Sequence, residues 1–157
     1  MLAKDIMRRK VVAVDRRMTA QELTQVLQVN GITGAPVVDE VGVVLGVVSQ
    51  TDLVRARCGG SAGEIPSYHR ELDEESTPPG IHFEEADLTR VEEIMTPGAI
   101  SFDEETRVET LAAAMLERHI HRVLITSGDR LVGIVTTMDL LRALVALQRR
   151  RAPAAGR

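Results

Sequence analysis

The stretch Gly46-Val-Val-Ser-Gln-Thr-Asp-Leu-Val-Arg55 returns in altered form as Gly133-Ile-Val-Thr-Thr-Met-Asp-Leu-Leu-Arg142, at a constant offset of 87 residues. In both copies an apolar run leads directly into a helical pattern, with a hydroxyl residue at the junction and an aspartate three positions later. A repeat of this kind indicates that the chain contains two copies of one structural unit.

The similarity continues upstream at an offset of 88 residues, which aligns Ile6-Met7 with Ile94-Met95 and Leu23 with Leu111. The offset changes by one residue between the turns at 39–42 and 127–129, where a deletion disturbs no core-facing side chain. The repeat therefore divides the chain into four parts. These are copy one at 1–57, an intervening segment at 58–90, copy two at 91–145, and a basic tail at 146–157 that we expect to be disordered.

Each copy predicts the order strand, helix, strand, strand, helix. The first helix of copy one begins at a capping box, Thr19 with Glu22, and ends at Asn30-Gly31; copy two offers Thr106 with Glu109 as its own box. A copy of about 55 residues buries too little apolar surface to be stable alone. We therefore expect an α+β fold in which the two copies pack through their sheets with pseudo-twofold symmetry. The expected strands are 11–14, 35–38 and 43–48 in copy one, and 123–126 and 131–135 in copy two.

The segment 58–90 differs in composition from both copies. It carries eight acidic residues against two arginines, a formal charge of about −6, whereas the whole chain carries −4. The remainder is therefore slightly basic, at about +2. Tyr68 and Phe83, two of the three aromatic residues, lie in this segment and would anchor it on the repeats; the alternative is a solvated insertion.

The doubled unit resembles the cystathionine-β-synthase (CBS) domain, arranged as a tandem pair or Bateman module. The resemblance covers nearly all of the chain except the segment 58–90 and the tail. The residues that carry it are Asp5-Ile-Met7, Gly34-Ala-Pro-Val-Val-Asp39, the stretch from Gly46 to Leu53, Glu93-Ile-Met-Thr-Pro97, His121-Arg-Val-Leu-Ile125 and the stretch from Gly133 to Leu140. The resemblance implies a regulatory module that binds AMP, ADP or ATP, or S-adenosylmethionine, in the cleft between the repeats.

On this resemblance, Ser49 and Thr136 would bind phosphate at helix N-termini, and Asp52 and Asp139, one turn later, would accept from the ribose hydroxyls. The alternative is that Ser/Thr-x-x-Asp is a plain N-capping pattern.

Arg122 would pair with phosphate, whereas copy one has Gly34 at that position, so we expect unequal sites. His121 is either a phosphate partner or a half-buried histidine, and His119 a surface residue at a helix end. Arg55 and Arg142 would reach a second phosphate or lie on a solvated helix face. Adenine would contact aliphatic and backbone groups near Val12, Ile32, Ala35, Ile100, Ile120 and Val123.

Other functional classes find little support. The chain has no catalytic or phosphate-loop motif, so we expect no enzyme, and Cys58, His69 and His82 are not paired as metal ligands, so we expect no metal and no required cofactor. The acidic charge and 2% aromatic content argue against nucleic acid as the main partner. A single cysteine and no apolar segment of spanning length favour the cytoplasm and no membrane partner.

The resemblance also implies a homodimer and a regulated protein that the sequence does not name. Candidate dimer faces are Ala20-Leu23-Leu27 and Val108-Ala112-Met115, which would equally serve as internal core. A dimerisation scaffold without a ligand, and a sensor of S-adenosylmethionine, remain the alternatives.

Overall fold

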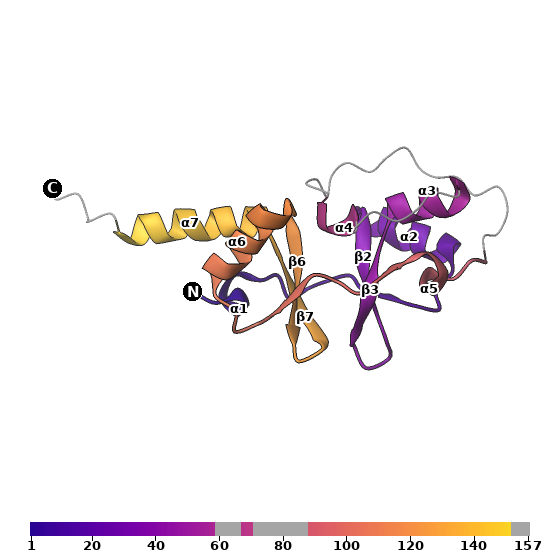
Figure 1. The fold of residues 1–157 in the computed structure, drawn as a ribbon, viewed down its shortest axis with the longest axis horizontal. Coiled ribbons are helices and arrows are strands. Elements are labelled where there is room, and N and C mark those ends of the chain that lie inside the picture. The colour runs from indigo at the N-terminus through magenta and orange to yellow at the C-terminus, as the bar shows by residue number, and fades with distance from the viewer. Residues whose placement is uncertain (59–66, 71–87, 152–157) are drawn as a thin grey trace.

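The structure, a computed structural model, describes residues 1–58, 67–70 and 88–151. Two small sheets carry helices at one end and hairpin tips at the other (Figure 1). Each repeat has the predicted order strand, helix, strand, strand, helix. Its elements are β1 (Val14–Asp15), α2 (Ala20–Asn30), β2 (Gly34–Val38), β3 (Val44–Ser49) and α3 (Gln50–Cys58), then β5 (Ser101–Asp103), α6 (Val108–Arg118), β6 (Arg122–Ser127), β7 (Arg130–Thr136) and α7 (Thr137–Arg151).

The two sheets have matching topology. In the first, β1 is parallel to β2, β2 is antiparallel to β3, and the short strand β4 (Thr96–Pro97) adds to the edge of β3. In the second, β5 is parallel to β6, which is antiparallel to β7. The mixed α+β fold and its two repeated units are therefore confirmed.

The repeats exchange their opening turns. The short helix α1 (Ala3–Ile6) packs into the second core, where Ala3 and Met7 join Leu111, and α5 (Val91–Ile94) packs into the first core, where Val91 joins Leu23. Backbone hydrogen bonds fix both exchanges, from the Ala3 N–H to the Thr106 carbonyl and from the Val91 N–H to the Met18 carbonyl, each 2.8 Å. The sequence boundary between the copies is therefore not the boundary between the two cores.

The sheets pack against each other through β3, β6 and β7. Val47, Leu124 and Ile134 form a third buried cluster between them, joined by Tyr68 of α4 (Ser67–Arg70). The hairpin tips are hydrogen bonded, with Val44 N–H donating to the Asp129 carbonyl and Leu131 N–H to the Gly42 carbonyl. This packing is the predicted sheet-to-sheet contact.

Of the two capping boxes predicted at helix starts, one is correct and the other is wrong. Thr19 and Glu22 form the expected capping box, since the Glu22 N–H donates to Thr19 Oγ1 and the Thr19 N–H to the Glu22 carboxylate. The box predicted at Thr106 is wrong, because α6 begins at Val108 with Arg107 as its N-cap and no side-chain cap. Thr106 instead closes a turn, its N–H donating to the Asp103 carbonyl at 2.9 Å.

The helix ends match at an offset of 88 residues. Gly31 ends α2 and His119 ends α6, both in the left-handed region with φ of 61° and 53°.

The last helix, α7, continues to Arg151. The prediction of a disordered tail that starts at residue 146 is therefore wrong for residues 146–151, which are helical. The reason is that Leu147 extends the apolar row of Leu140 and Leu144. No described helix is long and apolar enough to cross a membrane.

Candidate functional site

The first Ser/Thr-x-x-Asp motif lies where β3 meets α3. Asp52 is 3% exposed, and its Oδ2 accepts from the Ser49 N–H at 2.7 Å and from Ser49 Oγ at 3.0 Å. Its other oxygen, Oδ1, accepts from Nη1 of Arg55 at 2.8 Å. The buried carboxylate thus holds the strand–helix junction with one oxygen and a cation with the other.

The second motif, where β7 meets α7, repeats this arrangement and adds a contact. Asp139 Oδ2 accepts from the Thr136 N–H at 2.9 Å and from Thr136 Oγ1 at 2.7 Å, while Oδ1 accepts from Arg142 at 3.0 Å. Arg8, next to α1, donates its Nε–H to the same Oδ1 at 3.1 Å. The exchanged N-terminal segment therefore reaches the second motif.

The charge state of Asp139 follows from these contacts. Burial of the carboxyl opposes ionisation, but the hydrogen bonds from Thr136 and the positive charge of Arg8 outweigh it and lower the pKa of Asp139 below its ordinary value. Asp139 is therefore ionised near neutral pH. Each of Arg55 and Arg142 pairs with the aspartate of its own motif, and the side chain of Arg142 is 65% exposed, as a solvated helix face requires, whereas that of Arg55 is 22% exposed.

Two of the predicted phosphate residues of the second repeat, Arg122 and His121, contact α4. Arg122 is 4% exposed, and its guanidinium lies 5.1 Å from the centre of the Tyr68 ring. The His121 N–H donates to the backbone carbonyl of His69 at 2.7 Å. Tyr68 is buried, as its predicted role as an anchor requires, while Phe83 lies outside the described residues.

His69 makes two further hydrogen bonds with its ring. Nε2 accepts from the Ile100 N–H at 3.2 Å, so the ring proton lies on Nδ1, which donates to the Arg122 carbonyl at 2.9 Å. Burial, together with the charge of Arg122, lowers the pKa of His69 below its ordinary value, although the hydrogen bond to the Arg122 carbonyl acts in the opposite sense. The neutral ring thus provides one donor and one acceptor.

The residues predicted to contact adenine fall into a buried group and a partly buried group. The side chains of Ala35, Ile120 and Val123 are in the two cores, and those of Ile32 and Ile100 pack partly buried against them. Val12 is half-buried. Any ligand at these positions therefore meets mainly backbone groups and the half-buried side chains.

Sequence reasoning missed two polar atoms beside the first motif. Thr33 Oγ1 and Gln50 Oε1 are buried without a hydrogen-bond partner in the described part of the chain, although the Gln50 N–H donates to the Thr33 carbonyl. A buried polar atom without a partner costs about 1–3 kcal/mol, so such atoms indicate a site for water or a ligand. Thr33 aligns with His121 at the offset of 88 residues, which is the signal that would have found it.

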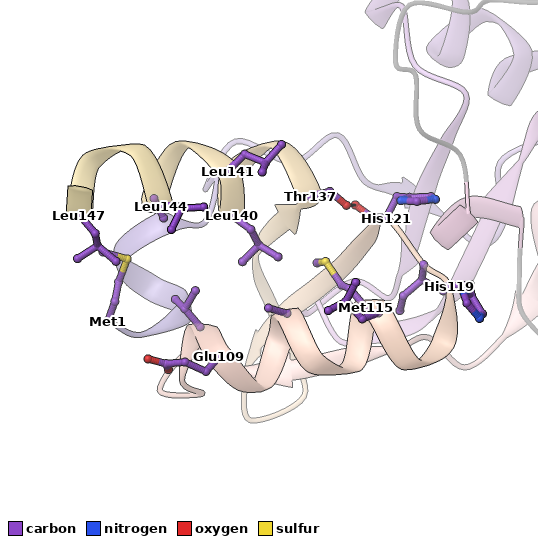
Figure 2. Close-up of a pocket in the computed structure, with 15 residues that line it drawn as sticks. Met1, Glu109, Met115, His119, His121, Thr137, Leu140, Leu141, Leu144 and Leu147 are labelled. Carbon is purple, nitrogen blue, oxygen red and sulfur yellow. Dashed lines mark hydrogen bonds between the residues drawn. The ribbon is translucent and has the colours of Figure 1, made fainter. Parts of the chain in front are cut away.

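A separate apolar groove lies between α6 and α7, with a volume of about 630 Å³. Figure 2 shows Leu140 and Leu147 of α7 and Met115 of α6 between the two helices. Leu141 and Leu144 also line it, half exposed.

The two candidate dimer faces predicted from the sequence differ in their surroundings. Ala20, Leu23 and Leu27 are core residues of the first repeat, whereas Val108 and Ala112 line the groove. Among the residues that the structure describes, no group of three or more His, Cys, Asp or Glu side chains could hold a metal ion.

Comparisons with known proteins agree with the fold. The family model of the CBS domain matches residues 3–59 and 91–146. The chain is 32% identical over 138 residues to "CBS domain-containing protein CBSX1, chloroplastic" of Arabidopsis thaliana, covering 83% of the chain and 58% of that protein.

Two solved structures share the fold at 24% identity. CBSX2 in complex with AMP has a TM-score of 0.68 and covers 96% of this chain and 98% of that one. The CBS domain pair of MJ0100 in complex with 5′-methylthioadenosine and S-adenosyl-L-methionine has a TM-score of 0.64, with coverage of 94% and 98%.

Proposed function

The chain belongs to the CBS domain family. We propose that it is a regulatory module that binds an adenine nucleotide between its repeats and transmits the resulting change of shape to a partner protein. The observation that carries the proposal is the pair of buried aspartates, Asp52 and Asp139, each at the start of a helix and each paired with an arginine. Buried carboxylates of this kind are costly to maintain, and ligand binding is a reason to keep them.

Binding would exchange hydrogen-bond partners at each motif. Ribose hydroxyls would take the place of the guanidinium on Oδ1, while Oδ2 keeps its bonds to Ser49 or Thr136. The released arginine, Arg55 or Arg142, would then meet the phosphate. The 65% exposed side chain of Arg142 has the room to make this turn, and the slightly basic body of the protein favours an anion.

The ligand class is inferred from shared chemistry. AMP, 5′-methylthioadenosine and S-adenosyl-L-methionine, which the two related structures hold, all contain adenine joined to a ribose ring with free 2′ and 3′ hydroxyls. We propose AMP, ADP or ATP as the ligand here, because arginines beside both motifs suit a phosphate better than an uncharged or cationic substituent. S-adenosylmethionine is the alternative ligand.

Thermal unfolding against AMP, ADP, ATP, S-adenosylmethionine and inorganic phosphate tests the proposal. A ligand at about 100 times its Kd stabilises the fold by roughly 2.7 kcal/mol, a shift of a few degrees. Asp139→Ala should remove most of the shift caused by a nucleotide while Glu105→Ala, a change at an exposed acidic residue, should leave it intact. No shift with any adenine compound at millimolar concentration would overturn the sensor function.

A scaffold function is the second candidate, and the groove between α6 and α7 supports it. Leu116 is 77% exposed, and Leu144 and Leu141 are about half exposed, which is an unusual apolar surface for a monomer. We propose that a second copy of this chain covers the groove. Sedimentation should show a dimer that Leu144→Glu dissociates and that Val29→Glu, at an exposed position of α2, leaves intact; a wild-type monomer at all concentrations overturns the dimer.

A further inference from the structure

The helix α4 lies between the repeats, against β3 on one side and β6 on the other, at the end where both motifs begin (Figure 1). Tyr68 and His69, at its centre, are 2% and 0% exposed. A four-residue helix from an acidic intervening segment thus contributes two buried side chains to the interface between the repeats.

His69 forms hydrogen bonds with three backbone groups of the second repeat. It bonds the Ile100 N–H and the Arg122 carbonyl with its ring, and the His121 N–H with its own carbonyl. These three residues are among those predicted to contact adenine or phosphate. Backbone groups that line the predicted nucleotide site of this repeat are therefore already bonded within the chain.

The donor and acceptor pattern of His69 matches that of adenine. The neutral imidazole donates from Nδ1 and accepts at Nε2. Adenine likewise presents an amino donor beside a ring-nitrogen acceptor. The Arg122 carbonyl could accept from, and the Ile100 N–H donate to, either group.

Tyr68 contacts both repeats. A Cβ built on Gly34 would lie 2.9 Å from Cδ2 of Tyr68, so the ring lies directly on the backbone of the first repeat, and the guanidinium of Arg122 lies 5.1 Å from the centre of the same ring. The α4 turn thus lies between Gly34 and Arg122, and a ligand bound between these residues would overlap with it.

We propose that the Tyr68-His69 turn is an internal ligand of the adenine pocket in the second repeat, and that an adenine nucleotide binds there only by displacing it. The inference rests on the proposed nucleotide function and specifies its regulation. The apparent affinity is then the intrinsic affinity multiplied by the fraction of molecules in which the turn is undocked, and binding releases a segment that a partner can recognise.

The sole tyrosine of the chain, without any tryptophan, reports the position of this turn. Acrylamide quenching of tyrosine emission should be weak in the free protein and should increase when AMP or ATP binds, with N-acetyltyrosinamide as a control for absorption by the nucleotide. Quenching that stays weak while calorimetry shows the nucleotide bound overturns the inference.

The variant His69→Ala removes the competing ring. Its affinity for the nucleotide in calorimetry should rise by about tenfold or more, which corresponds to the loss of roughly one net hydrogen bond. The exposed neighbour in the same turn gives the control, Arg70→Ala, which should leave the affinity unchanged. An unchanged or lower affinity of a folded His69→Ala protein means that the ring is part of the pocket wall, and this also overturns the inference.

The two proposals fail in different ways. If neither the wild type nor His69→Ala binds any adenine compound, the nucleotide function fails and the inference fails with it. If the wild type binds while Tyr68 stays protected, only the inference fails. The quenching measurement needs no variant, so the inference remains testable even where His69→Ala does not fold.

Discussion

The two repeats agree in their cores and differ at the interface between them. Leu23 and Leu111 are both fully buried at equivalent positions, and both motifs hold an aspartate in the same way. At this interface, Gly34 of the first repeat stands where the second has Arg122. The glycine leaves space for the Tyr68 ring, and the arginine lies beside that ring.

The difference between Gly34 and Arg122 explains how the single helix α4 can dock between two similar repeats. A single α4 cannot contact two equivalent pockets equally, so a pair of identical repeats would leave its docking undefined. With Gly34 on one side and the backbone of Ile100 and Arg122 on the other, the turn has one orientation. The sequence predicts unequal sites from Gly34 and Arg122. The contacts of Tyr68 and His69 in α4, which lies outside both repeats, add to this inequality.

The largest expected effect concerns the shared core. Leu23→Ala and Leu111→Ala should each lower the free energy of unfolding by about 2–5 kcal/mol, because each removes a fully buried side chain. Since α1 and α5 are exchanged, both variants should shift one common transition in urea denaturation followed by circular dichroism. Val29→Ala, at an exposed position of α2 away from the groove, should change the free energy of unfolding little. Two separate transitions, of which each variant moves one, would show that the repeats unfold independently.

A smaller effect is expected where the repeats differ. Gly34→Ala should destabilise the protein by about 1–3 kcal/mol and increase quenching of Tyr68, because the added Cβ would lie 2.8 Å from the Val48 carbonyl and 2.9 Å from the Tyr68 ring. Repeating the change in a Tyr68→Ala background separates the two contacts. An unaltered cost in that background would assign the strain to the Val48 carbonyl and not to α4.

The fold was predictable because its determinants are local and occur twice. The offset from Leu23 to Leu111 defined the repeat, and Thr19 with Glu22 defined a helix start. The exchange of α1 and α5 was not predictable, since Ile6-Met7 and Ile94-Met95 look alike whichever repeat they join. Thr106 was misread because a capping box and a turn that closes on Asp103 use the same residue types.

The candidate site was predictable in its residues but not in their partners. The sequence identified Asp52 and Asp139, yet left open whether they cap helices or bind ribose, and the structure shows the capping bonds without testing the ribose contact. Arg8 was missed because it lies 131 residues from Asp139 along the chain. His69 was missed because its role depends on α4 reaching the Arg122 carbonyl, and no local pattern encodes that contact.

A pH titration tests how α4 is held. The folded pKa of His69 lies below its unfolded value of about 6.5, so the unfolded chain binds more protons below that pH. The stability that depends on neutral His69 is complete above about pH 6.5 and is lost as the pH falls towards the folded value. The difference in unfolding free energy between wild type and His69→Ala should therefore shrink from pH 7.5 to pH 5.5. A constant difference over this range would show that His69 titrates alike in both states.

The smallest effect is expected at the ends of the equivalent helices. His119 is the one non-glycine residue with positive φ in the described part of the chain, and it occupies the position that Gly31 has in the first repeat. A side chain in the left-handed region costs about 1–2 kcal/mol, and glycine loses about 0.5–1 kcal/mol more in chain entropy on folding. His119→Gly should therefore stabilise the protein by about 0.5–1 kcal/mol in urea denaturation. Gly31→Ala should destabilise it by a similar amount, because no atom lies within 4 Å of a Cβ at Gly31 and only the backbone conformation matters. Destabilisation by His119→Gly would mean that the imidazole makes a contact worth more than the backbone strain, and the two helix ends would then differ in function and not only in residue type.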